Sequence, residues 1–248
     1  MAINMDKMKQ KLESLQGNGN KKSAFWRPQD GEQVIRIVPT ADGDPFKEYW
    51  FHYNLGNNPG FLSPKKNFGE DCPLDSYVRD LYRQGDEESI KMAKNLSARQ
   101  RFFSPVVVRG EEDQGVRIWG FGKMAYQELL NLVLNPDYGD ITDTEEGTDL
   151  VIKYGKPPGA QFPQTSITPR RKTTKLFDED EKVSAALTQI PDFDSVFEKK
   201  SATEVQSMLD DFIASQLGDD DEVESASTES QKYGGDSIDS KFDELLQE

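Results

Sequence analysis

Short apolar runs and turns alternate along the chain from about residue 31 onward. The clearest run, residues 33–38, contains four β-branched side chains around Arg36 and ends at Pro39. Runs of this kind, joined by segments rich in glycine, proline and aspartate, are typical of short antiparallel strands. Further strands are expected at residues 46–53, 102–109, 116–121, 150–154 and 165–168. The pattern predicts a mainly β fold, a small antiparallel barrel that carries inserted helices.

Helical periodicity appears between and after these strands. Helices are predicted at residues 76–82, 87–96 and 124–134. Residues 201–204 read Ser-Ala-Thr-Glu, a capping box that opens one more helix. The apolar face of that helix consists of Val205, Met208, Leu209, Phe212 and Ile213. We expect this C-terminal helix to pack back on the barrel.

The first 24 residues form a basic N-terminal arm. Its helical stripe consists of Met5, Met8, Leu12 and Leu15, and glycines at positions 17 and 19 end it. Lys21 and Lys22 follow these glycines. Because a helix of this length rarely persists in water without packing, we expect the arm to dock on another surface.

Charge divides the chain. Residues 1–176 hold 25 Lys and Arg against 24 Asp and Glu, whereas residues 177–248 hold 5 against 21. Residues 219–248 have 11 acids and 2 lysines. A segment this charged cannot bury enough apolar surface to offset the entropy lost on ordering, so residues 218–248 are predicted to be a disordered acidic tail. One helical face near its end consists of Ile238, Phe242, Leu245 and Leu246. This face favours a segment that folds onto a partner; the alternative is a solubility tail.

The composition excludes several classes of protein. A single cysteine allows no intrachain disulfide, which suits a reducing cytoplasm. No apolar run approaches the roughly 18 residues of a membrane span, and the first ten residues lack the apolar stretch of a secretory signal. We therefore expect a soluble, intracellular protein with no membrane partner.

The sequence offers little evidence of an enzyme active site. His52 and Cys72 are the only residues of their types, and no third group that would orient a Cys-His pair is identifiable. Residues 120–125 fit the dinucleotide fingerprint G-x-G-x-x-A, but residues 135–149 are turn-forming where a second strand-helix-strand unit is needed. Met124 also stands where a phosphate loop needs a hydroxyl. We expect no enzyme.

Basic and aromatic side chains interleave on two neighbouring predicted strands. Single-stranded nucleic acids are held by cationic grooves that follow phosphates and by rings on which bases stack. The first cluster consists of Arg99, Arg101, Phe102, Phe103, Arg117, Trp119 and Lys123, and the second includes Lys156 and Phe162. The alternative is that some of these rings belong to the core; adjacent Phe102 and Phe103 cannot both point inward on a regular strand.

The sequence resembles the single-stranded-DNA-binding, helix-destabilising proteins of T-even-type bacteriophages. The resemblance rests on the order and spacing of several segments over most of the chain. These are residues 33–39, 71–77, 99–108, 117–123 and 239–248. It implies that residues 25–217 form an OB-type barrel core with packed helices, and that Lys21 and Lys22 contact a neighbouring protomer. It also implies a DNA cleft lined by Tyr82, Phe102, Phe103, Trp119 and Phe162.

The family resemblance also implies zinc, held by one histidine and three cysteines. Here only His52 and Cys72 match, and Asp75 stands where the second cysteine of a C-x-x-C pair belongs. Structural zinc sites need four ligands, most often thiolates. We therefore predict that this chain has lost the zinc and has no cofactor.

Together these features predict a cooperative, sequence-independent single-stranded-DNA-binding protein of phage DNA replication, recombination and repair, in the cytoplasm of the infected bacterial host. The acidic tail is expected to recruit phage replication and recombination proteins. The alternative is an acidic protein-protein adaptor whose barrel has no DNA role. The placement of Arg99, Arg101 and Lys123 distinguishes the two, because a DNA-binding protein needs them together and an adaptor does not.

Overall fold

The computed structural model describes residues 24–218, except positions 57, 59, 161, 192, 194–196 and 198. The predictions for Lys21 and Lys22, and those for Ile238, Phe242, Leu245 and Leu246, lie outside the described residues. No helix in the described part is both long and apolar enough to cross a membrane.

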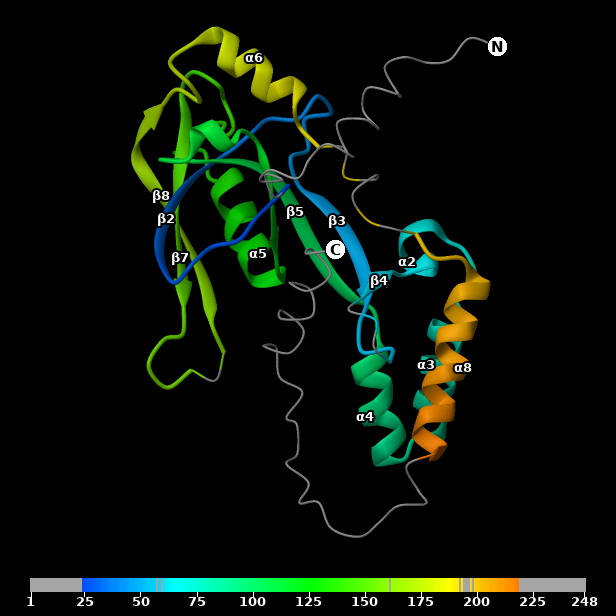
Figure 1. The fold of residues 1–248 in the computed structure, drawn as a ribbon. Coiled ribbons are helices and arrows are strands. Elements are labelled where there is room, and N and C mark those ends of the chain that lie inside the picture. The colour runs from blue at the N-terminus through cyan, green and yellow to red at the C-terminus, as the bar shows by residue number, and fades with distance from the viewer. Residues whose placement is uncertain are drawn as a thin grey trace, which may run out of the picture.

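The described chain builds one mixed sheet of eight strands (Figure 1). They are β1 (Phe25–Trp26), β2 (Gly31–Ile37), β3 (Lys47–His52), β4 (Phe61–Leu62), β5 (Arg99–Val108), β6 (Arg117–Phe121), β7 (Gly147–Gly155) and β8 (Gln164–Thr174). The order is β1-β6-β5-β2-β7-β8, with β3 pairing both β4 and the first half of β5. Only β1 and β6 run parallel. All strands predicted from the sequence are present, so the mainly β fold is confirmed.

The expected OB-type barrel is not closed in the described part of the chain. β1 and β8 lie at opposite ends of the strand order and do not pair with each other. β1 is only two residues long, and β8 is partly covered, because the backbone N–H of Ile167 donates to the Glu128 carboxylate at 2.9 Å. The fold is therefore a sheet whose edge strands remain separate.

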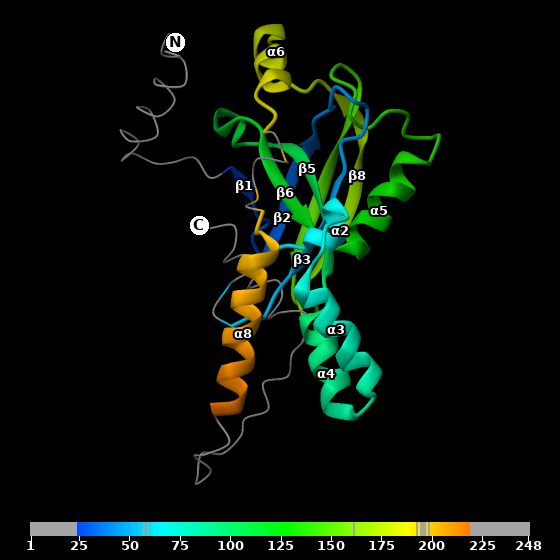
Figure 2. The same ribbon diagram turned by 90° about the vertical axis from the view of Figure 1, so that its right-hand side faces the viewer.

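Helices form two groups around this sheet. They are α2 (Pro64–Phe68), α3 (Pro73–Gln84), α4 (Glu87–Leu96), α5 (Lys123–Val133), α6 (Asp180–Thr188) and α8 (Ala202–Gly218), with a 3-10 turn at Glu112–Gln114. α3, α4 and α8 gather at one end of the molecule, whereas α5 lies against the sheet and α6 lies at the other end (Figures 1 and 2). Sequence predicted α3, α4, α5 and α8 but not α2 or α6.

The C-terminal helix α8 begins as predicted but packs elsewhere. In its capping box, the backbone N–H of Ser201 donates to Glu204 at 2.7 Å and the backbone N–H of Glu204 donates to the Ser201 hydroxyl at 3.3 Å. Its buried Val205 and Leu209 lie in one apolar cluster with Leu74 of α3. The prediction that it packs on the barrel is therefore wrong: α8 packs on α3 and completes a helical layer with α3 and α4, whose buried apolar residues lie in the same cluster.

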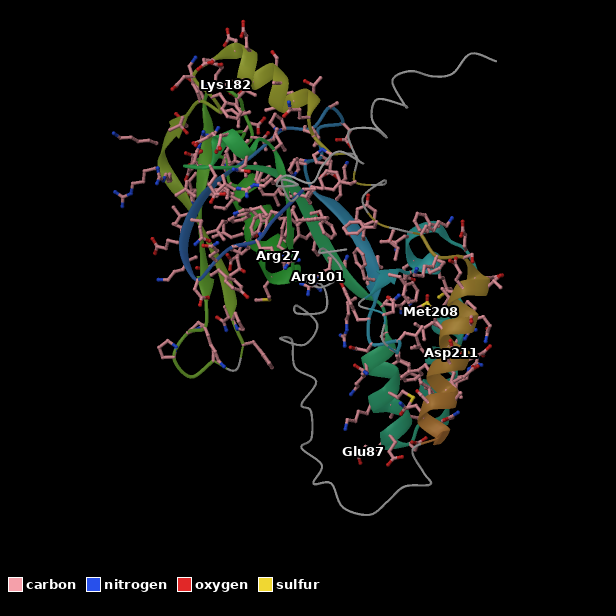
Figure 3. All side chains as sticks on the ribbon, in the orientation of Figure 1. Arg27, Glu87, Arg101, Lys182, Met208 and Asp211 are labelled. Atoms are coloured by element: carbon pink, nitrogen blue, oxygen red, sulfur yellow. The ribbon has the colours of Figure 1, made fainter. Side chains whose placement is uncertain are left out.

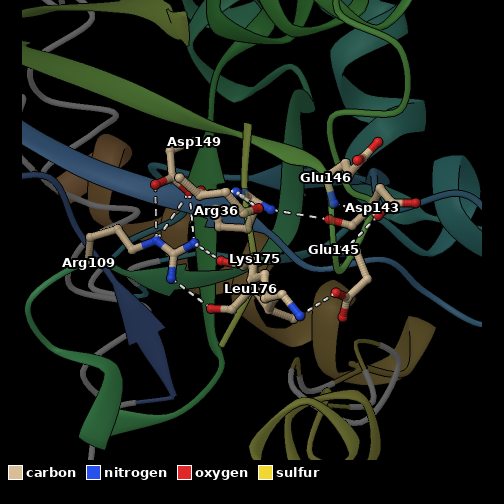
Figure 4. Close-up of polar contacts among 9 residues, drawn as sticks. Arg36, Arg109, Asp143, Glu145, Glu146, Asp149, Lys175 and Leu176 are labelled. Carbon is tan, nitrogen blue, oxygen red and sulfur yellow. Dashed lines mark hydrogen bonds and ion pairs between the residues drawn. The ribbon is translucent and has the colours of Figure 1, made fainter. Parts of the chain in front are cut away.

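A buried ion cluster ties β2, β5 and β7 together (Figure 4). The Arg36 side chain is fully buried, and its guanidinium donates to Asp149 at 2.9–3.0 Å and to the carbonyl oxygen of Thr174 at 2.8 Å. Arg109 donates to the same carboxylate at 2.9 Å and to the carbonyl oxygen of Leu176 at 2.7 Å. The cluster therefore anchors the chain that leaves the β7–β8 hairpin to the centre of the sheet.

Close packing around this ion cluster also explains the glycine that opens β7. A Cβ atom at Gly147 would lie 2.6 Å from Nη1 of Arg36 and closer still to the carbonyl oxygen of Asp143. Only glycine fits there without displacing the buried guanidinium.

Candidate nucleic-acid interface

Three cations predicted to bind DNA gather at the start of β5. Arg99 and Arg101 are two residues apart, and Arg99 donates to the carbonyl oxygen of Lys94 at 2.8 Å. Nη1 of Arg101 lies 3.5 Å from where a Cβ atom of Gly122 would be, so the guanidinium rests against the β6–α5 turn. Lys123, the exposed first residue of α5, follows that turn directly. We call Arg99, Arg101 and Lys123, with Arg27, the basic strip.

Arg27 belongs to this strip, and sequence reasoning missed it. β1 pairs in parallel with β6, with Trp26 opposite Trp119, so the next residue, Arg27, is level with Gly120 near the same turn. A two-residue strand leaves no periodic signal; the run Phe-Trp-Arg at residues 25–27 was the available clue.

Two of the buried aromatics lie on opposite faces of β5. Phe102 is 2% exposed, and its ring stacks on Tyr126 of α5 with centroids 3.9 Å apart. Phe103 is fully buried on the other face, where its ring meets Tyr49. The prediction that Phe102 and Phe103 line the cleft is corrected, because β5 is a central strand with side chains packed over both of its faces.

Trp119 and Arg117 of β6 are also engaged in internal contacts. Trp119 is 1% exposed and packs edge-on against Trp26. The Arg117 side chain is mostly buried, and its guanidinium forms an ion pair with Glu111 at 2.6 Å. Neither side chain offers a free surface to DNA in this structure, and their predicted place in the cleft is corrected with that of Phe102 and Phe103.

Other predicted contacts do face outward. Tyr82, at the end of α3, is 46% exposed, and its hydroxyl lies 3.5 Å from that of Ser97. Lys156 is exposed and Phe162 is partly exposed, both in the connection between β7 and β8. The β7–β8 hairpin and the helices α3 and α4 extend in the same direction on two sides of β5, whose Arg101 is labelled between them (Figures 1 and 3). The basic strip thus lies between two arms that each carry an accessible ring.

The dinucleotide fingerprint has no matching context. Residues 120–125 do join a strand to a helix, but β6 runs antiparallel to β5 and parallel only to the two-residue β1. A dinucleotide fold needs parallel strands joined by helices. Gly122 instead serves as the extended N-cap of α5.

One cluster in the described residues has side chains of metal-binding type. Ligand atoms of His52, Cys72 and Asp75 all lie within 4.8 Å of one another, between β3 and the start of α3. This cluster lies in the buried contact between sheet and helical layer and not on the basic strip.

Comparison with known families supports the nucleic-acid assignment. The family model described as gp32 DNA binding protein like matches residues 29–215, about three quarters of the chain. A search of curated proteins finds no matching sequence. The match spans β2 to β8, the helices α2 to α6 and most of α8, and it includes Arg99, Arg101 and Lys123; β1 and Arg27 precede it. The chain therefore belongs to the gp32-like family of single-stranded-DNA-binding proteins, as its sequence resemblance indicated.

Proposed function

We propose that this protein coats single-stranded DNA cooperatively and without sequence preference during phage DNA replication, recombination and repair. The observation that carries the proposal is the gathering of Arg27, Arg99, Arg101 and Lys123 beside one turn, in a member of a DNA-binding family. Phosphates are common to every sequence, so cations that contact them bind without base preference. Tyr82 and Phe162 flank the strip as ring surfaces on which any base can stack.

The two ends of the chain support cooperativity and recruitment. The arm of residues 1–24 carries 5 lysines against 2 acids, which suits contact with the acidic surface of a neighbouring protomer. Near its end, the sequence of residues 218–248 has apolar residues at helical spacing among acids, which suits recruitment of phage replication and recombination proteins. Such an activity belongs in the cytoplasm of the infected host.

The alternative, a protein-protein adaptor, does not require the basic side chains to lie close together. If the sheet bound only protein, nothing would require Arg99, Arg101 and Lys123 to lie together at one end of β5. Their proximity to the β6–α5 turn favours DNA binding. No observation favours the adaptor, so it remains an outcome of the test.

The test compares two variants that each remove one positive charge. Arg101→Gln changes the basic strip, and Lys182→Gln changes an exposed lysine on α6 at the far end of the molecule (Figure 3). Binding is followed by anisotropy of a labelled oligonucleotide, because Trp119 is too buried to report stacking directly. Arg101→Gln should weaken binding and reduce the salt slope by about 0.7, the value for one single-strand phosphate contact. Equal behaviour of the two variants would contradict the proposed interface.

A further inference from the structure

Four polar side chains meet where the sheet joins the helical layer. His52 ends β3, Ser63 is the N-cap of α2, Cys72 is the N-cap of α3, and Asp75 lies in the first turn of α3. Nε2 of His52 lies 3.4 Å from Oδ2 of Asp75 and 3.8 Å from Sγ of Cys72. The Ser63 hydroxyl donates to the same Asp75 oxygen at 3.1 Å. His52 is fully buried and the Asp75 side chain is 13% exposed.

Both ring nitrogens of His52 face acceptors. Nδ1 lies 2.9 Å from the carbonyl oxygen of Leu96, which can only accept, and Nε2 faces the Asp75 carboxylate. The Cys72 thiol also faces Nε2, so the carboxylate and the thiol meet at this one ring nitrogen. Burial alone would lower the pKa of His52, but hydrogen bonds with Asp75 and Cys72 outweigh it and raise that pKa to about 9.

This arrangement does not fit a zinc ion. The ligand atoms of His52, Cys72 and Asp75 are close enough to touch one ion, but the set contains one sulfur, whereas structural zinc sites are built from two to four thiolates with histidine. The Asp75 oxygen nearest to His52 already accepts a hydrogen bond from Ser63 and faces the His52 ring, so the polar atoms of the cluster satisfy one another. In the described part of the chain, no nitrogen or oxygen atom of this cluster is buried without a partner.

We propose that His52, Ser63, Cys72 and Asp75 form a metal-free link that takes over the structural role of the zinc implied by the family. The link joins β3 to α3 through Asp75 and to the end of α4 through the Leu96 carbonyl. It thereby holds the layer that carries Tyr82 against the strand neighbouring β5. Hydrogen bonds between buried polar groups suit this role, because a buried group that loses its partner is costly to leave unpaired.

The first experiment measures metal content and melting of the full-length protein. We expect less than a tenth of a zinc ion per chain after purification in zinc-supplemented medium, and the same melting temperature with and without chelator. Asp75→Asn should lower the melting temperature by roughly 5–10 °C, and added zinc should not restore it. Stoichiometric zinc or a chelator-sensitive melt in the wild type would overturn the proposal, whether or not Asp75→Asn folds. An unchanged melt of Asp75→Asn would overturn it too.

The second experiment asks whether the missing ligands can be restored. Ser63→Cys with Asp75→Cys places three thiols beside His52 and removes its carboxylate partner. We expect this double variant to bind one zinc ion, to give cobalt-thiolate absorption, and to become chelator-sensitive. Ser63→Cys with Ser184→Cys adds the same number of thiols, but Ser184 lies on exposed α6, so tight binding is not expected. Cobalt-thiolate absorption by the wild type would show that the original residues already form a metal site.

Discussion

The ion cluster at the centre of the sheet makes Asp149→Asn a sharp test of how the β7–β8 hairpin is held. The Asp149 side chain is 4% exposed and forms ion pairs with Arg36, which is fully buried, and with Arg109, which is 20% exposed. The substitution preserves the shape of the side chain but removes the negative charge that both guanidinium groups contact (Figure 4). Breaking a buried pair in this way costs about 3–5 kcal/mol, because the remaining charge stays uncompensated.

For a domain of this size that loss corresponds to a fall in melting temperature of about 10 °C. Urea unfolding followed by circular dichroism measures the free energy, and Asp42→Asn is the matched control. Asp42 pairs with Lys47 at the surface, so the control should melt like the wild type. If Asp149→Asn also melted like the wild type, carbonyl oxygens alone would suffice for Arg36, and the role given to the carboxylate would be wrong.

Three further outcomes follow from the same structure. Phe102→Ala should cost about 3–5 kcal/mol of stability, because its ring is core, yet the folded fraction should bind oligonucleotides normally. The pKa of His52 is raised from 6.5 to about 9, so its contribution to folding stability is complete below pH 6.5 and is lost as the pH rises from there through 9. The free energy of unfolding should fall by about 3 kcal/mol over this range, and urea unfolding of Asp75→Asn should show a flatter pH profile. Deleting residues 1–24 should lower cooperativity on long single strands but spare affinity for an oligonucleotide that holds one protomer, as titrations on both lengths would show.

Much of the fold was predictable because long strands and amphipathic helices carry their own periodic signal. β2, β3 and β5 were all expected within a few residues of their ends. β1 and β4 were not, because two-residue strands are defined by their pairing partners and leave no pattern in sequence. The apolar face of α8 was also correct, but its partner was not, since periodicity identifies a buried face without identifying what covers it.

Part of the candidate site was likewise predictable from the sequence, and part was not. Cations are rarely buried without a partner, so the exposed positions of Arg99 and Lys123 follow from sequence. Rings are ambiguous, because alternation assigns Phe102 and Phe103 to opposite faces but cannot reveal that both faces are covered. The ion pair of Arg117 with Glu111 depends on the turn between β5 and β6, which sequence does not specify in detail.

The central claim, binding to single-stranded DNA through the basic strip, is tested most directly by titrating the full-length protein against labelled oligonucleotides of mixed sequence at several salt concentrations. We predict tight binding with little base preference, much weaker binding to duplex, and a logarithm of affinity that falls with the logarithm of salt by about 0.7 for each phosphate contacted. Affinity that is indifferent to salt, confined to one sequence, or absent altogether would contradict the account.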